Sequence, residues 1–443
     1  MSDTHATSLA EPEVGSYFVA NYPPFSVWTR EAIERDARPA LASRPAAGVP
    51  LGLYLHIPFC RKRCHFCYFR VYTNKNAQQV EQYLDALVRE WALLRAQPAL
   101  DGRPVDFVYF GGGTPSFLSS KQLESLVARL TAVAPWSSAE EITFECEPGT
   151  ITEAKLDVIR RSGVTRLSLG VENFDDRILE INGRAHRSPE IGRSFAYARA
   201  IGFPQINIDL IAGMLGETDA NWQACIRRTL ELDPDSVTIY QMELPFNTTI
   251  SADLLKGTHQ FEQSVTSWDT RRRWVAEAFD ALERAGYSIG SAYTAVKDPS
   301  RTKFIYRDRL WEGADLAALG VASFGHVNGV HVQNLDTWET YLGALDLGEL
   351  PLGRAYRPSA DERLIREVIL QLKRGAIRPS YFQQKFGVDV RQRFADAWQS
   401  LAADGWLAKG GADRVALTTD GLMRVDMLLP RFFLQQHVGV RYT

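Results

Sequence analysis

Residues 53–69 read LYLHIPFCRKRCHFCYF and place three cysteines, Cys60, Cys64 and Cys67, at C-x3-C-x2-C spacing. They directly follow LGLYLHI (51–57), an apolar run that predicts a buried strand. A structural zinc site closes its tetrahedron with four ligands, and an ordinary iron–sulfur cluster has four thiolates. Three thiolates leave one metal position open, so the spacing predicts a loop that binds a metal centre on which chemistry takes place.

The pattern of a strand followed by an amphipathic helix repeats along the chain from this point. Strands are predicted at 51–57, 105–111, 141–147, 165–171, 206–213 and 236–242, with helices between them at 80–97, 120–134, 152–163, 191–202 and 218–232. Such units in succession build a parallel sheet with right-handed crossovers, and six are fewer than the eight of a closed barrel. We therefore predict an α/β fold, a partial (β/α)6 open barrel. The carboxyl ends of its strands, where the cysteines lie, are the end that carries active sites.

The two ends of the chain differ from this core. Residues 1–50 are loop-rich and predict an N-terminal arm, and 51–350 predict the partial barrel with an extension. Residues 351–443 contain helical segments followed by RVALTTDGLMRV (414–425), which resembles a small β-wing, so we predict a C-terminal helical, winged-helix-like domain. Its basic residues are scattered, which favours a lid or docking role over nucleic-acid binding.

Composition sets further limits. The chain has 443 residues, a net charge of −3 and 45% hydrophobic residues, which fits a globular protein of more than one domain and gives no global sign of nucleic-acid binding. No apolar window reaches the ~18 residues of a membrane span, and the N-terminus lacks the features of a signal peptide. We expect a cytoplasmic protein with reduced thiols and no membrane partner, in which Cys146 and Cys225 are core residues.

Three interpretations of the cysteine loop compete. Structural zinc would take His56 or His65 as its fourth ligand, the thiols could be incidental, or the loop could hold a 4Fe-4S cluster with one free iron. Basic residues at 61–63 favour the cluster, because positive charge would lower the pKa of the thiols. The apolar rings of Phe59, Phe66 and Phe69 would screen a cluster from water.

The motif HIPFC…C-x-F-C resembles the motif of radical S-adenosylmethionine (SAM) enzymes, and specifically that of oxygen-independent coproporphyrinogen III oxidase and its relatives. The resemblance extends over almost the whole chain. It implies a 4Fe-4S cluster held by Cys60, Cys64 and Cys67, whose open iron is chelated by SAM. It also implies reductive cleavage of SAM to a 5′-deoxyadenosyl radical, a low-potential electron donor such as flavodoxin or ferredoxin, and a substrate that is a tetrapyrrole or another large ring.

The resemblance further implies a set of SAM contacts at the strand ends. They are Tyr54, Phe66, Gly112, Gly113 and Thr114 of the GGGTP motif, Glu145, Glu172, Arg184, Asp209 and Ile211, with Tyr54 and Glu172 also expected to act in catalysis. Each has a structural alternative: a tight turn for the glycines, a salt bridge for Glu145, core pairing for Asp209 and a barrel-lining ring for Tyr54. The usual residue of the family at the position of Glu172 is glutamine, so an acid here adds a charge near the cofactor.

Other departures from the family leave the reaction open. Oxidases of this kind carry a further cysteine where this chain has Phe69, and small residues where it has Met242 and Glu243. The main interpretation is oxidative decarboxylation of a coproporphyrinogen-like substrate. The alternatives are methyl or methylene transfer with one or two SAM molecules, including cyclopropanation, and a haem-binding carrier, which usually lacks the N-terminal arm.

Substrate contacts are the least constrained part of the sequence. The segment FIYRDRLW (304–311) contains Tyr306, Arg307, Asp308 and Trp311, which could line a substrate pocket or form a surface loop. His326 and His331 could ligate haem iron, but we expect structural histidines.

Overall fold

The structure is a computed structural model that describes residues 18–256 and 265–440; the first 17 residues of the predicted arm lie outside these ranges. Its core is a run of six β/α units. The strands are β1 (Leu51–Ile57), β2 (Phe107–Gly112), β3 (Glu141–Cys146), β4 (Arg166–Glu172), β5 (Gln205–Ala212) and β6 (Ser236–Gln241). The helices are α2 (Ala77–Arg95), α3 (Ser120–Val133), α4 (Glu153–Arg161), α5 (Asp176–Ile181), α6 (Ser188–Ala200), α7 (Asp219–Leu232), α8 (Thr249–Lys256) and α9 (Trp268–Arg284). The predicted α/β class and its six units are confirmed.

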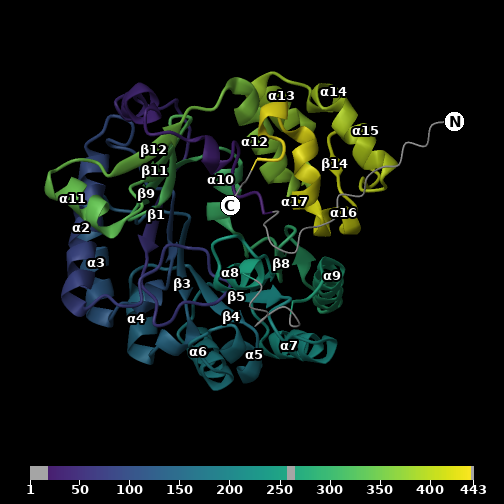
Figure 1. Cartoon of the computed structure of the whole chain (residues 1–443), viewed down its shortest axis with the longest axis horizontal. Helices are drawn as coiled ribbons and strands as arrows, with labels where there is room; N and C mark the ends of the chain where they lie inside the picture. The colour runs from purple at the N-terminus through teal and green to yellow at the C-terminus, as the bar shows by residue number, and fades with distance from the viewer. Residues whose placement is uncertain (1–17, 257–264, 441–443) are drawn as a thin grey trace.

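The strands form one twelve-stranded sheet in the order β12-β11-β10-β9-β1-β2-β3-β4-β5-β6-β8-β7. Neighbours among β1 to β6 are parallel, and β9 (Asp315–Leu319) adds a further parallel strand beside β1. The remaining strands pair antiparallel: β7 (Ser288–Ile289), β8 (Thr294–Val296), β10 (Phe324–Val327), β11 (Val330–Asn334) and β12 (Leu352–Tyr356). The sheet is therefore open, and helices α2, α3, α4, α6, α7 and α9 follow one another around its outer side (Figure 1).

Helix α2 shows why the local pattern was predictable. Asn76 caps it, because its side chain accepts a hydrogen bond from the Gln79 amide while the Gln79 side chain reaches back to the Asn76 amide. One face carries the buried residues Val80, Tyr83, Leu84, Leu87, Trp91 and Leu94. This spacing of three and four residues presents a single apolar stripe to the sheet.

A short helix, α10 (Ile305–Trp311), blocks the amino-terminal end of the barrel. The backbone amides of Ile305 and Tyr306 donate to the carboxylate of Glu141, the first residue of β3. The ring of Tyr306 enters the barrel and lies 4.3 Å from the ring of Tyr109 on β2. The prediction that Tyr306, Arg307, Asp308 and Trp311 line a substrate pocket is wrong, because they do not border the cavity described below. The alternative of a surface loop is also wrong, because the segment is a helix that contacts the sheet.

The N-terminal arm packs on the outer end of the sheet. It contains η1 (Phe25–Val27), η2 (Ile33–Ala37) and α1 (Arg38–Leu41), and Thr29 forms a β-bridge with Ala355 of β12. The Trp28 ring stacks on the ring of His331 at 5.1 Å. His331 Nδ1 also lies 3.0 Å from His326 Nδ1, and both rings are buried. These contacts confirm that the two histidines are structural.

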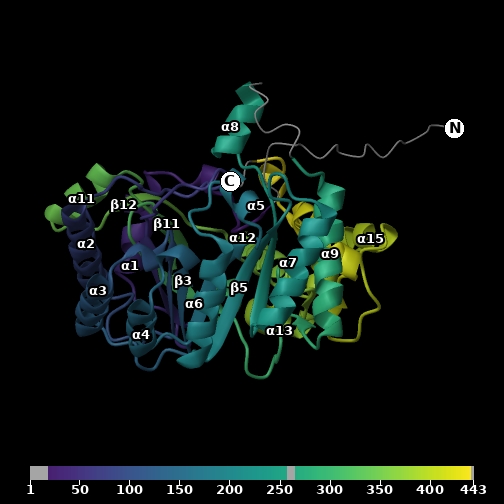
Figure 2. The same cartoon turned by 90° about the horizontal axis from the view of Figure 1, so that it is seen from below.

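The C-terminal part of the chain is mostly helical, as predicted. After α11 (Trp338–Asp346) and β12 come α12 (Ala360–Leu372), α13 (Pro379–Phe386), α14 (Val390–Arg393), α15 (Ala395–Ala403), α16 (Thr419–Met423) and α17 (Val425–Leu428). Between them β13 (Ala376–Ile377) and β14 (Val415–Ala416) pair antiparallel, and only β14 lies in the segment predicted as a wing. The division into three domains stays a prediction. Figure 2 shows α8 projecting beyond the carboxyl ends of the strands, and no helix within the described residues is both long and apolar enough to cross a membrane.

A buried ion pair joins the arm, the sheet and the C-terminal helices. Lys373 Nζ lies 2.6 Å from Asp426 Oδ1 and donates to the carbonyl of Val19 at 2.8 Å. The Asp426 carboxylate also accepts hydrogen bonds from the Val19 amide and the Tyr293 hydroxyl. The side chain of Lys373 is almost completely buried, so its charge depends on these partners.

Lys373→Met is expected to lower the free energy of unfolding by about 3–5 kcal/mol, because Asp426 would keep a buried charge without its partner. Urea denaturation followed by circular dichroism measures the change. Lys297→Met is the matched control: Lys297 pairs with Asp233 at the surface, where loss of a pair costs less than about 1 kcal/mol. Equal losses in the two variants would contradict the prediction.

Candidate active site

The three predicted metal ligands lie together in the loop that follows β1. Cys60, Cys64 and Cys67 are half-buried and border a cavity of about 470 Å³ at the carboxyl ends of the strands. The loop is held at both sides, because the Cys60 amide donates to the Tyr72 carbonyl and the His65 amide donates to the Asn182 carbonyl. The three thiols are thus presented to one cavity.

Two polar side chains from other strand ends approach the thiols. Thr114 Oγ1 lies 3.3 Å from Cys60 Sγ, and Arg184 Nη1 lies 3.4 Å from Cys64 Sγ. Hydrogen bonds to sulfur and a positive charge are what stabilise thiolates that carry an iron–sulfur cluster. The side chains present therefore fit such a cluster.

The two histidines considered as a fourth zinc ligand are occupied elsewhere. His56 lies between the Tyr54 hydroxyl and the Arg70 carbonyl, at 3.2 and 3.4 Å, and His65 Nδ1 lies 2.8 Å from the Ile181 carbonyl oxygen. Within the described residues, no group of three or more histidine, cysteine, aspartate or glutamate side chains is placed to hold a single metal ion. The geometry thus favours a cluster over zinc.

The expectation that basic neighbours lower the thiol pKa holds for Arg63, which lowers the pKa of Cys67, but burial outweighs this effect. Burial raises the pKa of Cys60 to about 12 and that of Cys67 to about 11. Arg61 turns away from the sulfurs to Glu147, and Arg63 donates to the Cys67 carbonyl. Because metal ligation requires thiolates, binding would release protons from these groups.

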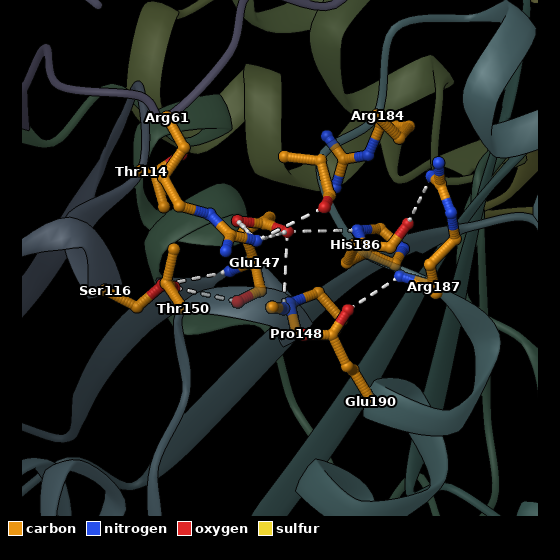
Figure 3. A network of polar contacts seen from close by, with 12 residues as sticks. Arg61, Thr114, Ser116, Glu147, Pro148, Thr150, Arg184, His186, Arg187 and Glu190 are labelled. Carbon is orange, nitrogen blue, oxygen red and sulfur yellow. Dashed lines mark hydrogen bonds and ion pairs between the residues drawn. The ribbon is translucent and has the colours of Figure 1, made fainter.

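Glu147, which the sequence analysis did not single out, connects the cysteine loop to the ends of β3 and β4 (Figure 3). Its carboxylate accepts hydrogen bonds from Arg61 Nη2 at 3.1 and 3.2 Å, and Oε1 lies 3.2 Å from His186 Nδ1. Burial opposes its ionisation, but His186, Arg184 and Arg61 together lower the pKa of Glu147 to about 2. This buried anion fixes the residue that follows Cys60.

The glycine loop after β2 lies directly against the cysteine loop. Gly112 has φ +107°, and a Cβ there would lie 2.3 Å from His56 Nδ1. A Cβ on Gly113 would lie 2.8 Å from the Ile57 carbonyl oxygen. The amides of Gly113 and Thr114 already donate to the carbonyls of Ile57 and Phe59. An ammonium group needs hydrogen-bond acceptors, so within this loop it could be bound by oxygen atoms but not by the amides.

Two predicted carboxylates, on the strands to either side of β4, extend into the same cavity. Glu145 of β3 accepts from the Tyr109 hydroxyl at 2.5 Å and from the Gly112 amide at 3.2 Å. Asp209 of β5 accepts from Ser168 Oγ at 2.8 Å and Asn207 Nδ2 at 2.9 Å. Burial raises the pKa of both, to about 7 for Glu145.

Glu172 and Arg184 form a loose pair beside the thiols. Glu172 ends β4 at a bulge with φ 62°, a left-handed conformation that is uncommon for a non-glycine residue. Its carboxylate lies 3.6 Å from Arg184 Nη2, which donates to the Gly170 carbonyl at 2.7 Å. Arg184 Nε is buried without a hydrogen-bond partner among the described residues, so this guanidinium has a donor available. Burial raises the pKa of Glu172 to about 7.

Of the predicted contacts, only Tyr54 does not border the cavity. Its hydroxyl meets His56 behind the cavity wall, and its ring lies 6.0 Å from the ring of Tyr109. Phe66 and Ile211 border the cavity and pack in one apolar cluster with Ile178. The roles of all these residues toward a ligand stay predictions.

Several residues that border the cavity were missed by the sequence analysis. They are Arg166, Tyr109 and Tyr240 on the strands, Tyr293 in the extension, Phe18 in the arm, and Arg424 and Asp426 near the C-terminus; Phe304, the first residue of the segment predicted as a possible pocket lining, also borders the cavity. Arg166 had a detectable signal, because a charged residue within a buried strand, two positions from Ser168, must face the barrel interior. The residues of the arm, the extension and the C-terminal part had no such signal in the sequence, because they come near the cavity only in the tertiary fold.

Comparisons with known proteins agree with this geometry. Residues 54–228 match the radical SAM superfamily. The oxygen-independent coproporphyrinogen III oxidase of Helicobacter pylori J99 is 30% identical over 371 residues, covering 80% of this chain and 79% of that protein. The heme chaperone HemW of Bacillus subtilis is 29% identical over 83% of this chain and 95% of its own length. The structure of coproporphyrinogen III oxidase (HemN) of Escherichia coli superposes with a TM-score of 0.80 at 25% identity, covering 94% of this chain and 96% of that one.

Proposed function

This chain belongs to the oxygen-independent coproporphyrinogen III oxidase family of the radical SAM superfamily, and we propose that it decarboxylates propionate side chains of a coproporphyrinogen-like tetrapyrrole. The observation that carries the proposal is the cavity bordered by three half-buried thiols, with Arg184 and Thr114 beside their sulfur atoms. When bound, a 4Fe-4S cluster supplies the electron that breaks a carbon–sulfur bond of SAM.

The residues of this chain position the reactants. Cys60, Cys64 and Cys67 would hold the cluster, and the free donor of Arg184 suits the carboxylate of SAM. Asp209 and Glu145 offer acceptors for ribose hydroxyls or an ammonium group. Ile211 offers an apolar surface for the adenine. Placing these groups around one cavity holds the reactants in position for a reactive species.

A second candidate function is haem binding for delivery. It is favoured by the similarity to HemW, which extends over 95% of that protein, and by Phe69 at the position where oxidases carry a further cysteine. The ring of Phe69 is about half exposed beside the cavity, so it cannot replace a thiol there. The N-terminal arm argues against this function.

One anaerobic experiment distinguishes the candidates. The cluster-loaded protein is reduced and incubated with SAM and coproporphyrinogen III, and products are analysed by liquid chromatography and mass spectrometry. Protoporphyrinogen with carbon dioxide supports the proposed function. Formation of S-adenosylhomocysteine without porphyrin turnover would indicate methyl or methylene transfer. Stoichiometric haem binding without turnover would indicate a carrier.

We also propose that electrons come from reduced flavodoxin or ferredoxin, and that the reaction takes place in the cytoplasm. Cleavage of SAM supported by either donor in place of dithionite tests the first point. Failure of both donors with fully loaded protein would contradict it.

Glu172→Gln is expected to remove most of the pH dependence of SAM affinity between about pH 6 and pH 8. The pKa of Glu172 is about 7, so its carboxyl is neutral below this pH and charged above it. The charged form competes with a ligand carboxylate for Arg184, so the affinity of the wild-type protein should fall about 3- to 10-fold as the pH rises.

Equilibrium dialysis of SAM against cluster-loaded protein measures this effect. Arg184, Asp209 and Glu145 also act on Glu172, and Glu145 titrates near the same pH, so a small slope should remain in the variant. A variant with the full wild-type slope would contradict the prediction.

A further inference from the structure

Arg166 is a buried cation inside the barrel without a polar partner of its own. It is the first residue of β4, its exposed fraction is 2%, and it borders the cavity. Its guanidinium stacks on the Phe304 ring at 4.1 Å from the ring centroid. Within residues 18–256 and 265–440, no side chain or carbonyl forms a hydrogen bond or ion pair with it. A buried charge left in this state is costly, which indicates a group reserved for a ligand.

The acidic groups of the barrel interior are close enough to act on Arg166 electrostatically, but each is engaged by other donors. Glu141 accepts from the Ile305 and Tyr306 amides and from Thr143. Glu145 and Asp209 have the donors described above. None of these three carboxylates lies within ion-pair distance of Arg166. The N–H groups of its guanidinium therefore stay available to a ligand, and its positive charge is only partly balanced.

The ligand chemistry follows from this arrangement. A guanidinium is always charged and presents donors in a fork that matches a carboxylate with two parallel hydrogen bonds. Phe304 covers one face of the fork and limits its movement, which reduces the entropy cost of binding. The surrounding side chains include the rings of Tyr109 and Tyr240 and the hydroxyl of Thr238, and such a site suits a carboxylate on an apolar arm.

We propose that Arg166 binds a propionate carboxylate of the ring substrate, an inference that rests on the function proposed above. The SAM that docks beside the cysteines is served by Arg184, whereas Arg166 begins the same strand that Glu172 ends, about 20 Å away along the backbone. From Arg166 the cavity continues past Tyr240, which is 41% exposed, to Arg272 and Arg424. A ring with several carboxylated arms can place one arm at Arg166 and keep its remaining part toward these residues.

The test measures binding of coproporphyrin III, the stable oxidised form of the substrate, to the full-length protein by fluorescence quenching. Arg166→Gln should weaken binding about 10- to 100-fold, the usual value of a charge-assisted hydrogen-bonded pair. Arg166→Lys should restore part of the affinity, because it keeps the charge but not the fork. Arg227→Gln, which removes an exposed arginine of α7 outside the cavity, should have no effect.

Two further measurements identify the source of the carboxylate. The tetramethyl ester of coproporphyrin III should bind wild type and Arg166→Gln equally, because it has no carboxylate to lose. Equilibrium dialysis of SAM against the cluster-loaded proteins should give the same affinity and stoichiometry for wild type and variant. A loss of one bound SAM with unchanged porphyrin binding would overturn the proposal and assign Arg166 to a second SAM.

The remaining outcomes are also decisive. Equal coproporphyrin affinity in wild type and Arg166→Gln would overturn the proposal while leaving the proposed function intact. A wild-type protein that does not bind coproporphyrin at all would overturn both. If Arg166→Gln does not fold, as judged by circular dichroism, Arg166→Lys provides the same comparison, with the free acid weakened and the ester unchanged.

Discussion

Replacing Cys64 with alanine should abolish cleavage of SAM and remove the brown colour of the iron-loaded protein. Cys64 is one of only three cysteines in the loop, and its sulfur atom receives the Arg184 guanidinium at 3.4 Å. With only two protein thiolates left, a 4Fe-4S cluster would lose one of its protein ligands and the negative charge of that thiolate. It would then not be held in its place in the cavity. Iron analysis, visible absorption and chromatography of 5′-deoxyadenosine measure the result after anaerobic reconstitution.

Cys225→Ala is the matched control for this loss. Cys225 is a buried free thiol on α7 that does not border the cavity, so its removal should keep iron content and cleavage. Circular dichroism should show that Cys64→Ala keeps the fold, since the thiol is only half-buried. Cleavage of SAM by Cys64→Ala at the wild-type rate would contradict the assigned role.

Replacing Arg184 with methionine should weaken SAM binding to the cluster-loaded protein by about 10- to 100-fold. The side chain brings a positive charge, an available Nε donor and contact with Cys64 to the same corner of the cavity. Its loss would also raise the pKa of Glu172, because Arg184 is the cation that lowers it, so Glu172 would be mostly neutral at neutral pH and would not itself add to the loss of affinity. Equilibrium dialysis of SAM, with iron content as an independent check, measures the effect.

The control for this variant is Arg187→Gln. Arg187 lies three residues further along, pairs with Glu180 at 3.6 Å and does not border the cavity, so its variant should bind SAM normally. Unchanged affinity in Arg184→Met would contradict the assigned contact. A loss of iron rather than of affinity would show that Arg184 supports the cluster instead.

Much of the fold could be predicted because its signals are local. The apolar stripe of α2, its cap at Asn76 and the short apolar strand segments each depend on residues close in sequence. Residues predicted at strand ends, such as Glu145 and Asp209, meet in one cavity because parallel strands end at the same edge.

The predictions that failed depended on orientation and on distant contacts. Arg61 follows Cys60 in sequence, but its side chain turns to Glu147, and at Cys67 the lowering of the pKa by Arg63 is outweighed by burial. The predicted role of Tyr54 toward SAM stays a prediction: Tyr54 shares a strand face with His56, but it lies one residue pair deeper and does not border the cavity. The position of α10 at the amino-terminal end of the barrel depends on Glu141, more than 160 residues earlier in the chain, and no local pattern of FIYRDRLW indicates it.

Helix α10 blocks the amino-terminal end of the barrel, and this has a consequence for a substrate with several identical arms. With Tyr306 filling that end of the barrel, a molecule cannot thread through the protein and must leave by the side from which it came. Each arm of a ring would then react in a separate binding event, after the ring has dissociated and bound again in a new orientation. Partly converted rings should therefore escape into solution early in the time course.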